Sequence, residues 1–196
     1  MVYLDIKERI LHAAEQVIRD KGLARATTKE IARIAGCSEG SLYLYFKGKD
    51  DIFLQVTRGQ LLPNFKKTLV SLPKRVGTGT VQETLTEVAE AALAFYLHSM
   101  PILASVFSEP ELLTGHRDGF RERNEGPHRP NETVAAYLHA EQTNGRIAPG
   151  LKPRIVADLL LGACFQRAFQ LQFLGETESK SAQKNYAENI VQTLFG

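Results

Sequence analysis

The positions of apolar side chains repeat with the period of an α-helix along nearly the whole chain. Residues 5–21 show the pattern first, with an apolar stripe on one side and charged side chains on the other. Gly22 follows the last periodic residue, where helices commonly end. Later helices are expected over residues 48–72, 80–98, 101–113, up to about Asn144, 151–174 and 179–195. No stretch alternates as a strand would, so the sequence predicts an all-α fold.

Prolines and glycines mark the expected breaks. Pro63 lies inside the helix expected over residues 48–72, and proline removes a backbone N–H, so a kink is expected there. Residues 73–80, PKRVGTGT, are expected to form a linker. Residues 114–131 contain several glycines, prolines and arginines and are typical of either a loop or a broken helix.

Residues 27–49 have the pattern of two short helices joined by a tight turn. Thr27 and Ser38 can each cap a helix start, and Gly36 stands where a left-handed helix end is wanted. Leu42 and Phe46 are four residues apart, so they share the inner face of the second helix. This pattern is typical of a helix-turn-helix, whose second helix enters a DNA major groove. A helical hairpin without a role in DNA binding is the alternative.

The run TTKEIARIAGCSEGSLYLYFKGKDDIF closely resembles the DNA-binding domain of the TetR (tetracycline-repressor) family of transcriptional regulators. The matching parts are Thr27-Thr28, Ile31-Ala32, Ala35-Gly36, Gly40-Ser41-Leu42-Tyr43, Tyr45-Phe46 and Lys47-Gly48-Lys49. The resemblance implies a three-helix DNA-binding head in residues 1–47. It also implies a larger helical domain for ligand binding and dimerisation in residues 48–196.

The same resemblance implies which side chains meet DNA. Thr28 and Lys29 would contact a phosphate or a base edge, and Tyr43 and Lys49 would hold the backbone. The residues facing the groove would be Glu39, Gly40, Ser41, Leu44 and Tyr45. Glu39 departs from the lysine or glutamine expected at its position. An acid there repels phosphates, unless it accepts a hydrogen bond from a cytosine amino group or from a backbone N–H.

The helix expected over residues 153–174 is apolar almost all round, so it must be covered on every side. Burial of one large apolar side chain contributes roughly 1.5–3 kcal/mol, which makes an exposed second face unfavourable. A two-fold homodimer that joins this helix and residues 179–195 from each chain into a four-helix bundle would cover it. The TetR resemblance implies a dimer of this kind. A monomer with an ordinary buried helix is the alternative.

The resemblance further implies a small-molecule effector bound inside the second domain. The candidate lining residues are Phe65, Phe95, Tyr96, Met100, Phe107, Tyr137, Phe165 and Phe169. Their mostly apolar character favours an apolar ligand with one or two hydrogen bonds, although such a stripe also fits plain core packing. The expected function is therefore a ligand-responsive regulator, in the family's usual mode a repressor. The alternative is a DNA-binding regulator whose second domain responds to a protein partner or only dimerises.

Composition narrows the classes further. The 24 basic and 22 acidic residues give a net charge of +2, which permits a local basic surface without indicating a protein that coats nucleic acid. The sequence contains no nucleophile elbow, Walker loop or zinc-ligand spacing, so we expect neither an enzyme nor a bound metal or cofactor.

Targeting signals are also missing from the sequence. No apolar run approaches the ~20 residues of a membrane span, and the start of the chain lacks the layout of a secretory signal. Cys37 and Cys164 lie far apart and form no CxxC motif. A reduced, cytoplasmic setting is expected.

Overall fold

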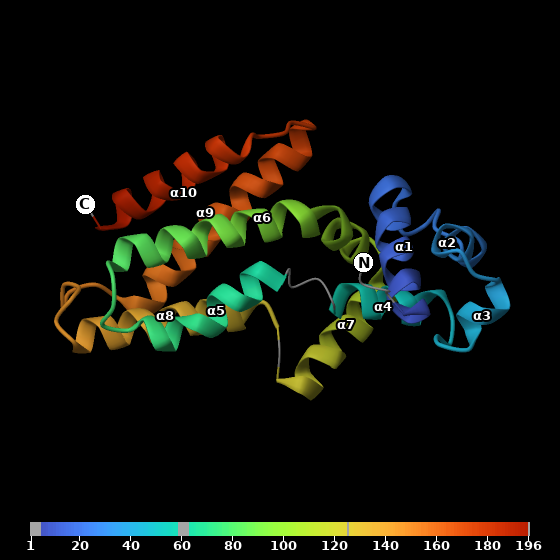
Figure 1. Cartoon of the computed structure of the whole chain (residues 1–196), viewed down its shortest axis with the longest axis horizontal. Helices are drawn as coiled ribbons and strands as arrows, with labels where there is room; N and C mark the ends of the chain where they lie inside the picture. Colours follow the sequence, from blue (N-terminus) through green and yellow to red (C-terminus); the bar gives the residue numbers. More distant parts are fainter. Residues whose placement is uncertain (1–4, 59–62, 125, 196) are drawn as a thin grey trace. The chain divides into compact units, whose positions relative to one another are not determined.

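The computed structural model describes residues 5–58, 63–124 and 126–195, and all regular secondary structure within these ranges is helical. The all-α prediction is confirmed. The helices are α1 (Ile6–Lys21), α2 (Thr28–Ala35), α3 (Glu39–Tyr43), α4 (Lys49–Arg58), α5 (Pro63–Arg75), α6 (Val81–Phe107), α7 (Pro110–Arg123), α8 (His128–Thr143), α9 (Pro153–Leu174) and α10 (Lys180–Phe195) (Figure 1).

The chain folds into two compact units, and α6 contributes to both. The first unit consists of Met1–Gln60 and Ser99–Asn124, and the second of Leu61–His98 and Glu125–Gly196. The first therefore holds α1 to α4, the end of α6 and α7, whereas the second holds α5, the larger part of α6 and α8 to α10.

The first unit is assembled around α1. Asp5 caps this helix: its carboxylate accepts from the N–H of Glu8 at 2.8 Å, and the Glu8 carboxylate accepts from the N–H of Asp5 at 3.3 Å. The buried side of α1 packs against α2 and α4. The core of this unit consists of the buried side of α1, buried residues of α2, α3, α4 and α6, and Phe46 just after α3. Its main residues are Ile10, Ala14, Val17, Ile18, Ile31, Leu42, Phe46, Ile52, Phe53, Ile102 and Val106.

This core extends beyond the predicted head. Ile52 and Phe53 of α4 and Ile102 and Val106 of α6 are all buried in it. The compact unit therefore divides the chain differently from the expected boundary at residue 47. Whether the functional boundary lies at residue 47 stays a prediction.

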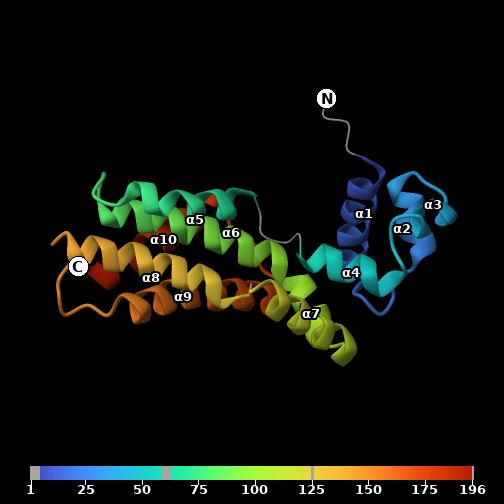
Figure 2. The same ribbon diagram turned by 90° about the horizontal axis from the view of Figure 1, so that it is seen from below.

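In the second unit, α8 packs against both α9 and α5, and α10 packs against α9. Figure 2 shows α5 and α6 running along one side of α8 and α9. The core contains buried apolar side chains from every one of these helices, chiefly Phe65, Leu72, Leu85, Val88, Leu93, Val134, Leu138, Val156, Leu160 and Leu161. The last helix contributes only Ala187 and Val191 as buried residues.

A buried carboxylate fixes the turn between α5 and α6 to the end of α8. Glu141 is fully buried, and its Oε1 accepts from the N–H of Gly77 at 3.0 Å. Its Oε2 lies 2.9 Å from Nε of Arg146, so a cation compensates the buried charge. Gly77 has φ of 78°, a left-handed conformation that favours glycine.

The two sides of α9 are both apolar but only one is buried. Its buried side carries Val156, Ala157, Leu160, Leu161, Cys164, Ala168 and Leu171. Large apolar side chains also stand exposed along the rest of the helix, namely Ile155, Leu159, Phe165, Phe169, Phe173 and Leu174. The expectation that one chain covers only part of this helix agrees with these exposures.

Three proline predictions need correction or remain open. The predicted helix start at Pro101 is wrong, because α6 runs through this residue to Phe107. The predicted linker start at Pro73 is also wrong, since α5 continues to Arg75. Met100 and Ile102 next to Pro101, and Leu72 next to Pro73, are buried, so core packing outweighs the lost backbone hydrogen bond.

Pro63 is the first residue of α5, a position that tolerates proline. The expected helix over 48–72 also crosses residues 59–62, which lie outside the described residues, so the kink stays a prediction. The uncertain stretch 114–131 proves to be mostly helical. It contains the end of α7, which stops at Asn124 in a left-handed conformation with φ of 51°, and the start of α8 at His128.

One described helix, α6, is long and apolar enough to cross a membrane by length and composition alone. The sequence pattern did not suggest this because Pro101 divided the run into two expected helices. Leu85, Val88 and Leu93 are fully buried within the chain, and 39% of the apolar window is buried. These three residues place part of α6 in the core of the second unit.

Two leucines near α3 provide a matched test of the head's core. Leu42 is 0% exposed and Leu44 is 83% exposed. We expect Leu42→Ala to lower the free energy of unfolding by about 2–5 kcal/mol, because it removes buried methyl groups and leaves a cavity. Leu44→Ala should change it by less than about 0.5 kcal/mol. Urea denaturation at one fixed protein concentration measures both, and equal losses would contradict this packing.

Candidate nucleic-acid interface

The turn between α2 and α3 is built by local hydrogen bonds that the sequence encodes. The Thr27 hydroxyl accepts from the N–H of Glu30 at 3.2 Å and caps α2. The helix ends at Gly36, whose φ of 67° lies in the left-handed region. The N–H of Cys37 then donates back to the carbonyl of Ala32 at 3.0 Å. These bonds reverse the chain within a few residues and start α3 in a fixed direction.

The next helix, α3, is short and strongly capped. The Ser38 hydroxyl accepts from the N–H of Ser41 at 3.0 Å and lies 2.8 Å from the Ser41 hydroxyl. Leu42 turns into the core of the first unit, and Phe46 joins it there just after the helix. The inner side of this segment is thus fixed by burial, which leaves the opposite side for solvent or a partner.

That opposite side carries large side chains that the chain itself does not cover. Tyr43, Leu44 and Tyr45 are 53%, 83% and 44% exposed. A Cβ added to Gly40 would meet only the Ser38 hydroxyl, at 3.8 Å, which is an ordinary contact. The folded chain therefore does not require a glycine here. Close approach of another molecule would.

The two helices of the motif are also joined on their exposed side. The Thr28 hydroxyl donates to Oε1 of Glu39 over 2.5 Å. These residues are the first of α2 and of α3, and they are eleven positions apart in sequence. No periodic pattern predicts this contact, because it depends on the angle at which the turn sets the two helices.

Basic residues flank this surface. The Lys49 Nζ lies 5.4 Å from the ring centroid of Phe53, and the Lys7 Nζ lies 5.9 Å from that of Phe46. The Lys47 N–H donates to the Asp51 carboxylate at 2.9 Å and fixes the start of α4. Lys29 is exposed on α2. All nine residues expected to meet DNA lie in the first unit, and their individual contacts stay predictions.

The structure brings four of the eight expected effector residues into one row of rings within the second unit. Phe65 of α5 stacks on Phe95 of α6 with centroids 5.2 Å apart, and Phe95 contacts Tyr96 at 5.1 Å. Tyr96 then meets Phe165 of α9 edge to face at 5.4 Å. Burial raises the pKa of Tyr96 to about 12, which reflects an apolar surrounding. This aromatic row crosses from the interior to the partly exposed side of α9.

The other expected effector residues are separate from this row. Phe169 is 51% exposed and stacks on Phe173 at 5.9 Å. Tyr137 is buried, and its burial raises its pKa. Met100 and Phe107 belong to the first unit, and Phe107 is 64% exposed at the end of α6. Their roles as ligand contacts stay predictions.

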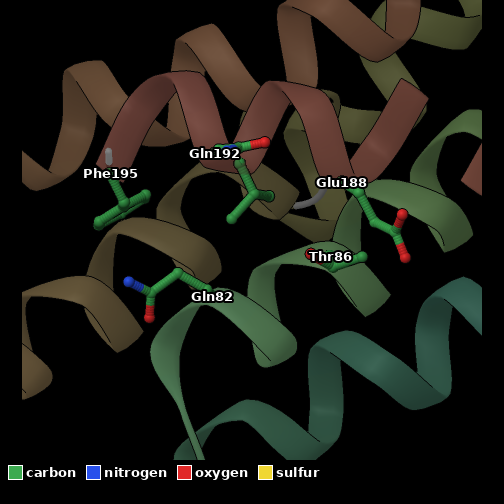
Figure 3. Close-up of a pocket in the computed structure, with 6 residues that line it drawn as sticks. Gln82, Thr86, Glu188, Gln192 and Phe195 are labelled. Atoms are coloured by element: carbon green, nitrogen blue, oxygen red, sulfur yellow. The ribbon is translucent and has the colours of Figure 1, made fainter. Parts of the chain in front are cut away.

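A surface pocket of about 340 Å³ lies elsewhere in the second unit, between α6 and α10. Figure 3 shows Gln82 and Thr86 of α6 facing Glu188, Gln192 and Phe195 of α10. No sequence pattern indicates this pocket, because its lining mixes polar and apolar residues and its two walls are about a hundred residues apart.

The cysteines and histidines add no chemistry to the described site. Cys164 is fully buried, and burial raises the pKa of its thiol to about 12, so it stays protonated and packs as an apolar group. Within residues 5–58, 63–124 and 126–195, no group of three or more His, Cys, Asp or Glu side chains could hold a metal ion.

Comparison with known proteins gives a consistent result. The model of the "Bacterial regulatory proteins, tetR family" matches residues 10–56. A fatty acid metabolism regulator protein of Bacillus subtilis (strain 168) is 26% identical over 162 residues, which cover 79% of this chain and 77% of that protein.

Solved structures share the whole fold. A regulator from Mesorhizobium loti MAFF303099 that is assigned to the TetR family has a TM-score of 0.77 and 19% identity, covering 96% of this chain and 94% of its own. The transcriptional regulator FadR from Bacillus subtilis, in complex with stearoyl-CoA, has a TM-score of 0.66 and 20% identity, covering 93% and 96%. At these identities the likeness shows a common fold.

The motif that the sequence predicts, the head built around it and the family match over residues 10–56 thus coincide. Residues 10–56 therefore form a helix-turn-helix domain of the TetR family, and the chain is a transcriptional regulator that binds DNA through this domain.

Proposed function

We propose that the protein is a ligand-responsive repressor that binds a palindromic DNA operator as a homodimer and is released by a small, mostly apolar effector. The observation that carries the proposal is the divided surface of α3. Leu42 of α3 and Phe46 just after it are held in the core, while Tyr43, Leu44 and Tyr45 between them stand exposed. Such a regulator acts where the chromosome lies, in the cytoplasm.

The exposed side has the chemistry of a major-groove surface. Hydroxyls of Ser41 and the two tyrosines can donate to phosphates, and Leu44 can offer apolar contact to a thymine methyl group. Lys29 and Lys49 supply positive charge at its borders. Each phosphate neutralised by such a cation releases counterions, which makes binding depend on salt.

The exposed apolar side of α9 supports the dimer. Ile155, Leu159 and Phe169 are each about half exposed in the single chain. Gly162 lies on the same exposed side, and a Cβ added to it would meet no atom within 4 Å. A glycine inside a helix costs about 1 kcal/mol relative to alanine, and nothing in the chain itself offsets this cost. Close approach of a second helix would do so.

The aromatic row supports the effector, and the relatives suggest its class. Two of them are described as a fatty acid metabolism regulator and as a FadR structure in complex with stearoyl-CoA. We therefore propose an effector with a long acyl chain that lies along Phe65, Phe95, Tyr96 and Phe165. The effector would bind better to a conformer whose two heads are wrongly spaced for successive major grooves.

Selection from a random duplex library tests DNA binding. We expect one enriched palindrome whose half-sites are about one helical turn apart or somewhat more. Its affinity, measured by fluorescence anisotropy, should fall steeply with salt. Tyr43→Ala should weaken it at least about tenfold, because an exposed contact is lost while the core is kept. Val70→Ala, an exposed change in α5, is the control. Equal operator affinities of Tyr43→Ala and Val70→Ala would contradict the assignment of Tyr43 as a DNA contact.

Sedimentation velocity tests the dimer. We expect wild type to sediment as a dimer and Phe169→Glu as a monomer at micromolar concentration. A charge buried without a partner costs several kcal/mol, and two-fold symmetry places it in the interface twice. Val70→Glu, which adds the same charge to exposed α5, should stay dimeric. A dimeric Phe169→Glu variant would show that α9 is not the interface.

Titration with acyl-CoAs of increasing chain length tests the effector. We expect stearoyl-CoA to raise the thermal midpoint and to release operator DNA, while free CoA does neither. Affinity should rise with chain length by about 0.8 kcal/mol per buried CH₂, roughly fourfold. Saturating acyl-CoA that leaves DNA affinity unchanged would refute the proposed mechanism. It would favour a second domain that responds to a protein partner or only dimerises.

A further inference from the structure

Glu39 is the least expected side chain on the DNA-facing side of the motif, because its charge has the same sign as a phosphate. It is the first residue of α3 and is exposed. Capping of α3 does not employ its side chain, since the Ser38 hydroxyl accepts from the N–H of Ser41. Its carboxylate accepts instead from the hydroxyl of Thr28 on α2.

This bond fixes the carboxylate in one place. The Thr28 hydroxyl and Oε1 of Glu39 are 2.5 Å apart, within the range of strong hydrogen bonds to an ionised acceptor. Thr28 is itself held at the first position of α2, where the neighbouring Thr27 supplies the cap. A long side chain that would otherwise sample several rotamers is thereby held before any DNA is bound.

The bond uses only a part of the acceptor capacity. A threonine hydroxyl donates one proton, whereas an ionised carboxylate offers two oxygens with about four lone-pair directions. Oε2 of Glu39 therefore remains able to accept from a donor outside the protein. In the major groove, the donors it can reach are the amino groups of cytosine and adenine, since phosphate oxygens and base carbonyl oxygens only accept hydrogen bonds.

Base chemistry then separates the candidates. In the major groove, cytosine presents its N4 amino group as a donor. Adenine also has an amino donor, at N6, but its N7 acceptor lies beside it and would repel a carboxylate. Guanine presents two acceptors, and thymine an acceptor and a methyl group. A carboxylate fixed at the start of α3 therefore favours cytosine over every other base.

We propose that Glu39 reads one cytosine in each half-site of the operator, and that Thr28 is the positioning residue that aims its carboxylate. This inference rests on the proposed operator binding through α3. The inference goes beyond that proposal because it assigns a base to Glu39, whose role the family resemblance left open. Glu39 lowers affinity for sequences lacking the cytosine, because its charge then meets the groove without a donor.

The test uses the operator selected by the wild-type protein, with each cytosine replaced in turn by N4-methylcytosine. This base keeps its pairing with guanine but loses the groove-facing N4 donor. Anisotropy titrations at one salt concentration give the ratio of affinities for the parent and substituted duplex. We expect a loss of about tenfold for wild type at one position per half-site, the usual size of a single base-contact loss.

Three variants test whether the loss of affinity caused by N4-methylcytosine depends on Glu39 and Thr28. Glu39→Gln keeps the shape and removes the charge, so the affinity loss caused by N4-methylcytosine should shrink at that position, because a neutral amide oxygen accepts a weaker hydrogen bond than a carboxylate. Adenine should become the better base there, because an amide can bond both N6 and N7. Thr28→Val keeps the shape and removes the hydroxyl, so the loss should shrink while staying at the same position. Glu15→Gln, which removes an acid paired with Arg19 on α1, should keep the wild-type ratio at every position.

The failures are distinguishable. No enriched operator for the wild-type protein would overturn the proposed DNA binding together with this inference. An operator whose N4-methylcytosine profile is the same in Glu39→Gln and wild type would overturn the reading by Glu39 alone. A uniform gain of affinity in Glu39→Gln, without change at any one position, would also overturn it, since that is the result for a merely repulsive charge. An unchanged ratio in Thr28→Val would remove Thr28 from the proposal.

Discussion

The DNA-facing surface depends on the burial of two side chains behind it. At five residues, α3 is far shorter than a helix that is stable alone in water. Leu42 and Phe46 anchor the segment in a core that α1 completes, and the Ser38 cap satisfies the helix start. Tyr43, Leu44 and Tyr45 are consequently exposed and take no part in that core. Their identities can change with the operator while the scaffold stays the same, as expected of function placed on a fold.

A similar division governs the second unit, where burial on one side of α9 leaves an apolar side uncovered. The interior of this unit is tied together by the Glu141 carboxylate and by the aromatic row from Phe65 to Phe165. The row ends at a residue of α9 that is 40% exposed. A ligand that displaced any ring of the row would therefore act on the helix that is proposed to meet the second chain. Effector binding and subunit contact would then share a physical path.

Local patterns predicted the helices and the motif well because their causes are local. Gly22, Gly36 and Ser38 end or start helices through bonds within a few residues, and each stands where the sequence indicated. The prolines misled because their effect depends on the core. Pro101 sits inside α6, where buried neighbours keep the helix intact. Residues 114–131 were compatible with a loop or a broken helix, and the structure has a broken helix, in which α7 ends at Asn124 and α8 begins at His128.

The candidate site was predictable to the extent that it repeats with a helical period. Exposure of Tyr43 and Leu44 follows from burial of Leu42, but the bond between Thr28 and Glu39 joins two helices and leaves no periodic trace. Phe65 and Phe95 were expected in one pocket, and their stacking agrees with that grouping. Met100 and Phe107, on the same helix as Phe95, fall in the other unit, a division that no local pattern reveals.

That division gives the first unit an unusual order of assembly on the ribosome. Its core needs Ile102 and Val106, which follow the first sixty residues only after about forty residues of the other unit. The motif-bearing helices leave the ribosome early, but the surface they bury is completed only when the far end of α6 emerges. At a synthesis rate of about 5–20 residues per second, this leaves a few seconds in which the nascent head lacks part of its interior. A chain cut after α4 would remain in that state.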